Sequence, residues 1–263
     1  MSNQAQRLDS ATESGKTDSG SEMHLTDHLE ELRRRLIVSF IAIAIATVGS
    51  YFFSEQLFKL LMAPLLQVMP PKTNLIFTGL AETFFTYLKI SLLAGFFLAT
   101  PVVIYEIWKF TAPGLYAHEK RYVFPFVFFA SLFFIGGALF GYFVVFPFGF
   151  KFFMGFATDF IRPMPTVREY FSFSVRLLFA FGVVFELPVV TAFLATLGLI
   201  HYKTLVRMRK YAILGAFVIA AILTPPDVAS QLMMAGPIVL LYELSIIVCR
   251  IFGRKKKESD LEE

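Results

Sequence analysis

The sequence has one cysteine, Cys249, and four histidines among its 263 residues. A lone cysteine cannot form an intramolecular disulfide, and it lacks the companions that a structural zinc site needs. The zinc-protease pattern His-Glu-x-x-His, the hydrolase pattern Gly-x-Ser-x-Gly and the phosphate loop Gly-x-x-x-x-Gly-Lys are also missing. We therefore expect no metal, no cofactor and no enzymatic activity.

Charge is scarce as well, at 17% of residues, whereas hydrophobic residues make up 56% and include 33 phenylalanines. This composition excludes an ordinary soluble domain and predicts an all-α, polytopic membrane protein. The net charge of +4 is modest, and the basic residues cluster beside apolar runs. Lipid phosphates explain such clusters better than nucleic acid does.

Three regions follow from the distribution of apolar residues. Residues 1–25 are polar and are expected to form a disordered cytoplasmic tail, because they cannot bury enough surface to offset their ordering entropy. Residues 26–250 are expected to form the membrane domain, and 251–263 a charged cytoplasmic tail. The arginine run before 36–53 superficially resembles a secretory signal. That apolar run is longer than a signal core, so we interpret it as a retained first span.

Six apolar runs predict six membrane-spanning helices. The fifth run is short for a crossing, and we expect the sixth to be short too, which would leave one wall thin and the bilayer strained beside Glu186. A short surface helix with Pro64 and a proline-bounded loop follow the first span. The six runs are 36–53, 89–109, 122–150, 171–196, 211–223 and 228–249.

Orientation follows from the lysines and arginines on each side of these runs. The side that carries both termini holds fifteen in the flanking segments, and the other side holds five, namely Lys59, Lys72, Lys151, Arg162 and Arg168. Because basic residues favour the cytoplasmic side, both termini are expected in the cytoplasm.

A dense charge cluster, Asp-His-Leu-Glu-Glu-Leu-Arg-Arg-Arg-Leu at 27–36, stands where the polar tail meets the first run. Asp27 with Glu30 three positions later predicts a helix start that continues into the span. Helical spacing then places Glu31 one turn from Arg35. The alternative interpretation is that the arginines of this cluster bind lipid phosphates and fix the orientation of the helix in the membrane. It accounts for the arginines but not for the acidic residues beside them.

A second charged connector, 111–121, lies on the same side as Glu31 and contains Glu119. Such carboxylates suit a ligand with guanidinium groups, because a planar guanidinium can donate two parallel hydrogen bonds to a carboxylate and an ammonium cannot.

The fourth run contains two ionisable residues, Arg176 and Glu186. A charge at mid-depth in the membrane is unfavourable, so Glu186 is expected to face protein, water or a partner, unless both residues lie nearer the interfaces than these boundaries imply. Glu243, near the basic end of the sixth run, is expected to be an interfacial carboxylate paired with a connector arginine.

Four motifs occur in a fixed order along this six-span plan. They are His28-Leu29-Glu30-Glu31-Leu32-Arg33 with Arg35, Ala112-Pro113-Gly114-Leu115-Tyr116 with His118-Glu119, Phe181-Gly182 with Phe185-Glu186-Leu187-Pro188, and Leu223-Thr224-Pro225-Pro226-Asp227. Together they resemble TatC, the polytopic subunit of the twin-arginine protein translocase. The resemblance runs from about Thr26 to Arg250.

The resemblance implies a receptor in the bacterial inner membrane that binds signal peptides with paired arginines at the cytoplasmic face. It would act with single-span partners of the TatA and TatB type, and with further copies of itself, to move folded proteins across the membrane. The proton gradient would supply the energy, without nucleotide. By motif match, the signal-peptide site would contain Glu31, Glu119, Leu29, Arg33 and Phe110.

The same resemblance implies roles for three residues outside that site. Glu186 would lie in a concave, membrane-facing pocket and offer a polar contact to a partner's span. Pro64 and Asp227 would serve structure or assembly. Arg176 and the long polar N-terminal tail depart from the family pattern.

Two other functions compete with the receptor. An ion-coupled secondary transporter could use Glu186 and Glu243 as proton sites, but it predicts internal repeats, and the two halves show no convincing duplication. A purely structural assembly subunit would use the carboxylates as topology anchors only.

Overall fold

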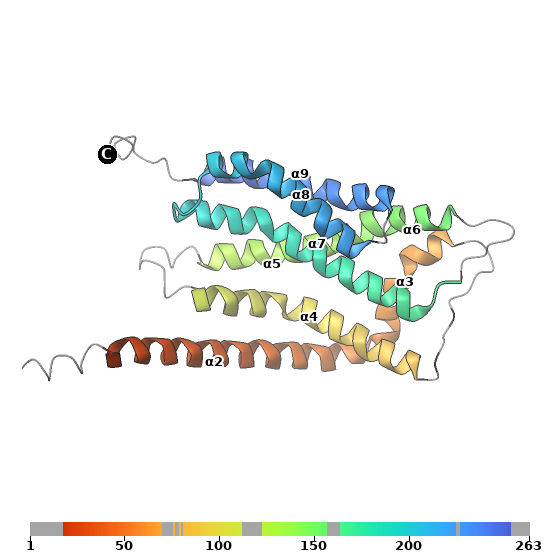
Figure 1. Ribbon diagram of the computed structural model, residues 1–263. Coiled ribbons are helices and arrows are strands. Elements are labelled where there is room, and N and C mark those ends of the chain that lie inside the picture. The colour runs from red at the N-terminus through yellow and green to blue at the C-terminus, as the bar shows by residue number, and fades with distance from the viewer. Residues whose placement is uncertain are drawn as a thin grey trace, which may run out of the picture.

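The computed structural model describes residues 18–69, 76, 79, 81–111, 123–156, 164–224 and 227–253, with side chains for all of them except 18–27, 111 and 123 (Figure 1). Within these residues all the regular elements are helices, apart from one parallel bridge between Ile76 and Thr166. The prediction of an all-helical fold is confirmed. The helices are α2 (Asp18–Tyr51), α3 (Ser54–Val68), α4 (Glu82–Thr111), α5 (Val123–Phe140), the π-helix η3 (Gly141–Val145), α6 (Phe146–Met154), α7 (Val167–Thr196), α8 (Tyr202–Leu223) and α9 (Val228–Phe252).

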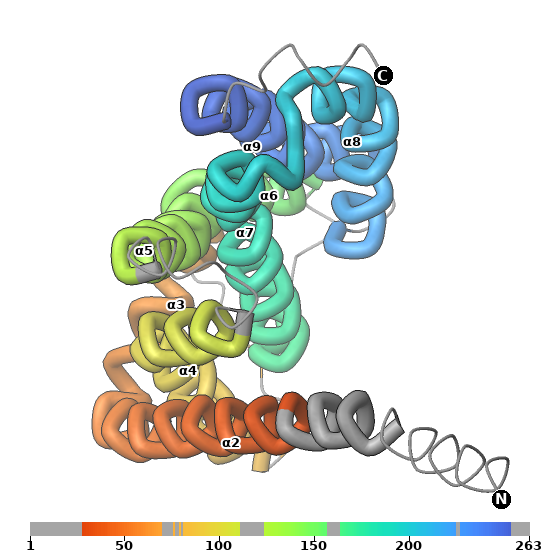
Figure 2. Tube along the Cα trace, turned by 90° about the vertical axis from the view of Figure 1, so that its left-hand side faces the viewer, coloured from red at the N-terminus to blue at the C-terminus, as the bar shows by residue number. Residues whose placement is uncertain are grey.

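The helices form a curved row in which each packs on its neighbours. Along the row, α2 packs on α4, α4 on α5, α5 on α7, α7 on α9 and α9 on α8. Figure 2 shows α2 and α8 at opposite ends of this row. In Figure 1 the start of α2 and the end of α9 lie at the same end of the helices.

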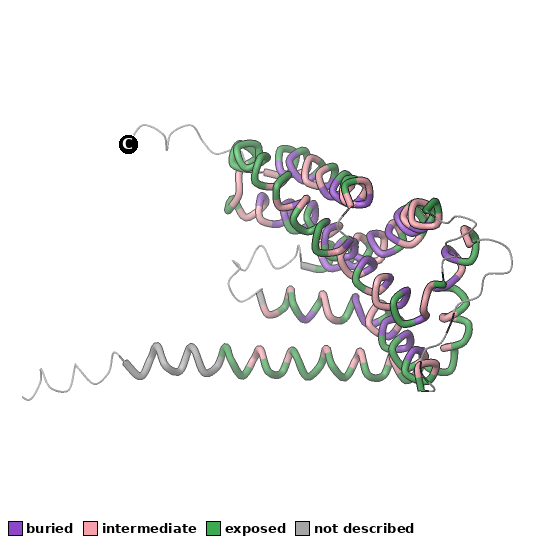
Figure 3. Tube along the Cα trace, turned by 45° about the vertical axis from the view of Figure 1, so that its right-hand side comes forward, coloured by how far each residue is buried: buried purple, intermediate pink, exposed green. Residues whose placement is uncertain are grey.

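Burial is uneven along the row (Figure 3). Buried positions gather on α7, whose side chains contact neighbours on several sides. In α2, by contrast, Ser50 is the one buried residue between 28 and 51. An apolar helix with so little buried surface is stable only where its other faces meet lipid, so α2 belongs at the lipid-exposed edge of the protein.

Two glycines allow helix backbones to approach closely. A Cβ added to Gly95 on α4 would lie 2.6 Å from the backbone nitrogen of Thr47 on α2. A Cβ on Gly137 of α5 would lie 2.8 Å from Cβ of Phe185 on α7. Small residues at such crossings are typical of helix pairs in membranes.

Four helices or helix runs are long and apolar enough to cross a membrane: Glu82–Phe110, Phe124–Met154, Val167–Thr196 and Val228–Phe252. A fifth crossing is possible if α2 and α3, which bend by 87° at their junction, count together. The 22-residue α8 is not among them, and its first half carries the four basic residues Lys203, Arg207, Arg209 and Lys210. The protein is therefore a multi-pass helical membrane protein.

The structure corrects two boundary predictions. α2 begins at Asp18, so Asp27 is not its N-cap and the helix enters the segment 1–25. No proline interrupts the chain between 18 and 35, and the helix continues through the polar residues. α9 is 25 residues long, about 37 Å, so the prediction of a short sixth span is wrong. The helix passes Cys249 and ends at Phe252, with Gly253 as its C-cap.

Candidate functional site

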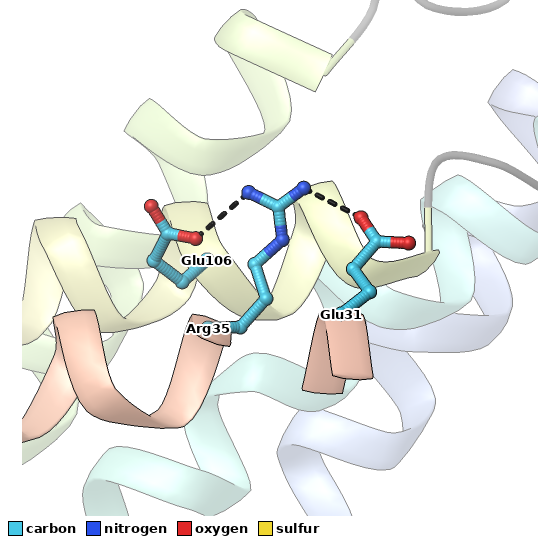
Figure 4. Close-up of polar contacts among 3 residues, drawn as sticks. All are labelled: Glu31, Arg35 and Glu106. Atoms are coloured by element: carbon cyan, nitrogen blue, oxygen red, sulfur yellow. Dashed lines mark hydrogen bonds and ion pairs between the residues drawn. The ribbon is translucent and has the colours of Figure 1, made fainter. Parts of the chain in front are cut away.

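The charged turn of α2 forms a bridge to α4 through one arginine (Figure 4). Nη2 of Arg35 donates a hydrogen bond to Oε1 of Glu31 at 2.6 Å, and Nη1 donates to Oε2 of Glu106 at 3.0 Å. The contact with Glu31 is the predicted pair one helical turn apart, and it is confirmed. The contact with Glu106 joins residues 71 positions apart, because α2 and α4 lie side by side.

Burial makes this bridge more than a surface ion pair. Glu106 is 8% exposed, and a carboxylate so far from water requires a charged or hydrogen-bonding partner. The Arg35 side chain is 17% exposed and that of Glu31 is 30% exposed. Glu106 is thus the inner end of the bridge, and Glu31 is the end that water or a ligand reaches.

The bridge also shifts the pKa values of Glu31 and Arg35, which lie before the first apolar run. The hydrogen bond from Arg35 lowers the pKa of the Glu31 carboxyl below its ordinary value of 4.5. The carboxylate of Glu31, followed by that of Glu106, raises the pKa of the Arg35 guanidinium. Glu31 and Arg35 are therefore both ionised at neutral pH.

A cavity of about 440 Å³ opens beside the bridge. Three carboxylates and three cations line it, so the formal charges balance. The cavity has room for the side chain of a charged ligand, and its carboxylates can accept hydrogen bonds from a guanidinium or an ammonium. Its lining consists of Glu30, Glu31, Arg34, Arg35, Val38, Glu106 and Lys109.

The other residues predicted for the signal-peptide site are placed as follows. Phe110, at the end of α4, stacks on the His28 ring with centroids 4.4 Å apart. Leu29 is 62% exposed, and Arg33 is also exposed. Glu119 lies outside the described residues. The structure thus brings Phe110 to the same helix ends as Glu31, through the contact with His28.

Sequence reasoning missed Glu106. It lies within the predicted second span, three residues before Lys109, and is surrounded by apolar residues. An acid inside such a run is itself a signal, since ionisable residues in spans need partners. Applying that rule would have identified Glu106, although not its partner on another helix.

Glu186 lies on α7 and lines a separate cavity of about 330 Å³, which α4 and α5 also line. Its Oε1 atom is buried and has no hydrogen-bond partner among the described residues. Arg176, ten positions earlier on the same helix, is exposed and lies about 15 Å away along the axis. The remaining lining is almost wholly apolar: Phe96, Thr100, Val103, Ile104, Ile107, Trp108, Phe134, Val183 and Val190.

Pro64 is buried inside α3. Proline has no backbone N–H, so the carbonyl of Leu60, four residues earlier, loses its helical donor. The Tyr142 hydroxyl donates to that carbonyl at 2.5 Å, which links α3 to η3. Tyr170 of α7 donates to the next carbonyl, that of Leu61, at 2.6 Å.

Asp227 caps the N-terminus of α9. Its Oδ1 atom accepts a hydrogen bond from the backbone N–H of Ser230 at 2.7 Å. The Ser230 hydroxyl, followed by its backbone N–H, lowers the pKa of the Asp227 carboxyl. Further along α9, Glu243 accepts a hydrogen bond from Arg209 of α8 at 2.7 Å, so its predicted pairing with a connector arginine is confirmed.

No group of three His, Cys, Asp or Glu side chains that could hold a metal ion occurs in the described part of the chain. The fold and the charged turn together define a helical, multi-pass membrane protein with a site of acids and arginine at one end of its bundle.

Comparisons with known proteins identify the family. The profile described as Sec-independent protein translocase protein (TatC) matches residues 27–237. The TatC protein of Desulforapulum autotrophicum is 55% identical over 90% of this chain and 88% of its own. That of Magnetococcus marinus is 48% identical over 91% and 88%. A crystal structure of the twin-arginine translocase receptor TatC superposes with a TM-score of 0.76 at 43% identity, covering 86% of this chain and 100% of that one.

The chain therefore belongs to the TatC family and is a component of a Sec-independent protein translocase. These relatives give no support to a secondary transporter. The proton site that the transporter would need at Glu243 is instead an ion pair with Arg209.

Proposed function

We propose that this chain is the receptor of a twin-arginine translocase, and that it binds the paired arginines of signal peptides at the cytoplasmic ends of α2 and α4. The observation that carries the proposal is the contact of Glu31 with a guanidinium, at 2.6 Å beside a cavity of about 440 Å³. A carboxylate that already accepts one guanidinium has suitable geometry for another.

The proposed site contains Glu31 and Glu119 as acceptors of the two guanidinium groups, with Leu29, Arg33 and Phe110 around them. Exposed Leu29 offers apolar surface to the hydrophobic part of a signal peptide. Phe110 offers a ring edge and, through its stack on His28, holds the two helix ends together.

The proposed topology has six spans, with α8 as the fifth and both termini in the cytoplasm of a bacterium. The excess of lysine and arginine at the ends that carry the termini supports this orientation. We propose TatA- and TatB-type single-span proteins, further copies of this chain and the lipid bilayer as partners, and the proton gradient as the energy source. Glu186 would supply a polar contact for a partner's span, because its Oε1 atom has no partner among the described residues.

The test is a binding measurement on the detergent-purified chain. A peptide with an Arg-Arg pair ahead of an apolar run is compared with its Lys-Lys twin. We expect a clear preference for arginine, which disappears when Glu31→Gln and Glu119→Gln are combined. Glu55→Gln is the matched control. Glu55 forms an ion pair with Lys59 one helical turn away, as Glu31 does with Arg35, but it lies on α3. Equal binding of the two peptides would contradict the receptor proposal.

A further inference from the structure

Arg35 holds two carboxylates in the way that a guanidinium ligand would. One terminal nitrogen bonds Glu31 at 2.6 Å and the other bonds Glu106 at 3.0 Å, while Figure 4 shows the guanidinium between them. Nε of Arg35 is buried and has no hydrogen-bond partner in the part of the chain that the structure describes. The two terminal nitrogens therefore make all the polar side-chain contacts of this arginine among the described residues.

We propose that Arg35 is an internal substitute for the ligand: it occupies Glu31 in the free receptor, and a signal-peptide arginine displaces it from Glu31 while Glu106 retains it. This inference rests on the proposed receptor function. It makes Arg35 and Glu106 residues that set affinity, in addition to the acids that bind the peptide.

The asymmetry in burial determines which contact breaks. Glu106 is 8% exposed, so removing Arg35 from it would leave a buried charge without a partner, which is strongly unfavourable. The Glu31 side chain is 30% exposed and lies against the cavity, so water or an incoming ligand can replace Arg35 there. The bond to Glu31 therefore opens first, and the bond to Glu106 persists.

The exchange also favours arginine over lysine. Replacing one guanidinium on Glu31 by another keeps the number and kind of hydrogen bonds, so an arginine competes with Arg35 on equal terms. A lysine ammonium cannot present the same planar pair of donors and competes less well. Occupation of Glu31 by Arg35 thus lowers the affinity for arginine and lysine ligands by the same factor, and the preference for arginine comes from the better contact that its planar guanidinium makes with Glu31.

Two variants test the inference. Arg35→Gln combined with Glu106→Gln removes the buried pair together, so that neither charge is left alone. Arg35→Lys keeps the charge but cannot bridge two carboxylates through a planar fork. We expect the Arg-Arg peptide to bind the double variant about tenfold more tightly than the wild type, and Arg35→Lys to fall between them.

A third variant and a control locate the effect. Adding Glu31→Gln to the double variant is expected to abolish the gain, because the gain depends on a vacated Glu31. Replacing Glu55 and Lys59 by glutamine removes a pair of the same spacing and the same 2.6 Å distance on α3, and is expected to leave the affinity unchanged. Size-exclusion profiles and thermal melts show whether each variant is folded.

The outcomes separate this inference from the proposed function. Wild-type binding that prefers arginine and depends on Glu31, but that weakens or stays equal in both Arg35 variants, would overturn the inference and leave the receptor standing. Arg35 would then be a structural link between α2 and α4. Absence of any arginine preference in the wild type would overturn both.

Discussion

Replacing Gly95 by alanine is expected to separate α2 from α4. The new Cβ would lie 2.6 Å from the nitrogen and 2.7 Å from the Cα of Thr47, whereas ordinary contacts lie at 3.4–4 Å. Both contacted atoms are backbone, so the two helices must move apart by roughly 1 Å. Overpacking of this kind destabilises a protein by about 1–3 kcal/mol.

The matched control is Gly49→Ala, since Gly49 lies on α2 and a Cβ there meets nothing within 4 Å. Both variants gain about 1 kcal/mol from the higher helix propensity of alanine, so the difference between them isolates the packing term. Thermal unfolding in one detergent, followed through the single tryptophan, Trp108 on α4, measures that difference. Equal melting temperatures for the two variants would show that Gly95 does not set the distance between α2 and α4.

Three further predictions concern charged groups. Asp227→Ala removes the acceptor for the Ser230 N–H, so faster amide hydrogen exchange is expected in the first turn of α9. Because Arg35 lowers the pKa of Glu31, Glu31 stays ionised down to pH values below 4.5; binding of the Arg-Arg peptide is expected to be level from pH 8 to pH 5 and to fall only in more acidic buffer. Loss of binding already near pH 6 would contradict this. Glu186→Gln is expected to weaken co-purification of a single-span partner and to leave peptide affinity unchanged; the reverse pattern would remove Glu186 from the partner site.

Features set by neighbouring residues could be predicted from the sequence. The pair of Glu31 with Arg35 depends only on helical spacing, because residues four positions apart lie one turn apart on the same face. The pairing of Glu243 with a connector arginine was predictable because α8 and α9 are consecutive helices that pack side by side, so residues at similar distances from their short connection lie opposite each other. In each case the interacting residues belong to one helix or to two consecutive helices.

Features that depend on distant residues were not predictable in this way. Glu106 meets Arg35 only because α2 and α4 pack together, and the glycine that permits this packing, Gly95, lies eleven positions before Glu106 on α4. The start of α2 at Asp18 was missed because a polar composition indicates solvation and does not exclude a helix. The 87° bend after Tyr51 likewise has no proline to signal it.

Helix α4 contributes to the charged bridge and to the Glu186 cavity on different faces. Glu106 faces α2, while Thr100, Ile104 and Ile107 line the cavity of Glu186. If a peptide arginine displaces Arg35 from Glu31 alone, the bond to Glu106 and the contact at Gly95 both persist, so the packing of α2 on α4 is unchanged. Peptide binding would then leave the Glu186 cavity as it is. A response at Glu186 would have to come through a partner's span, or through the chain between α4 and α5, rather than through displacement of α4.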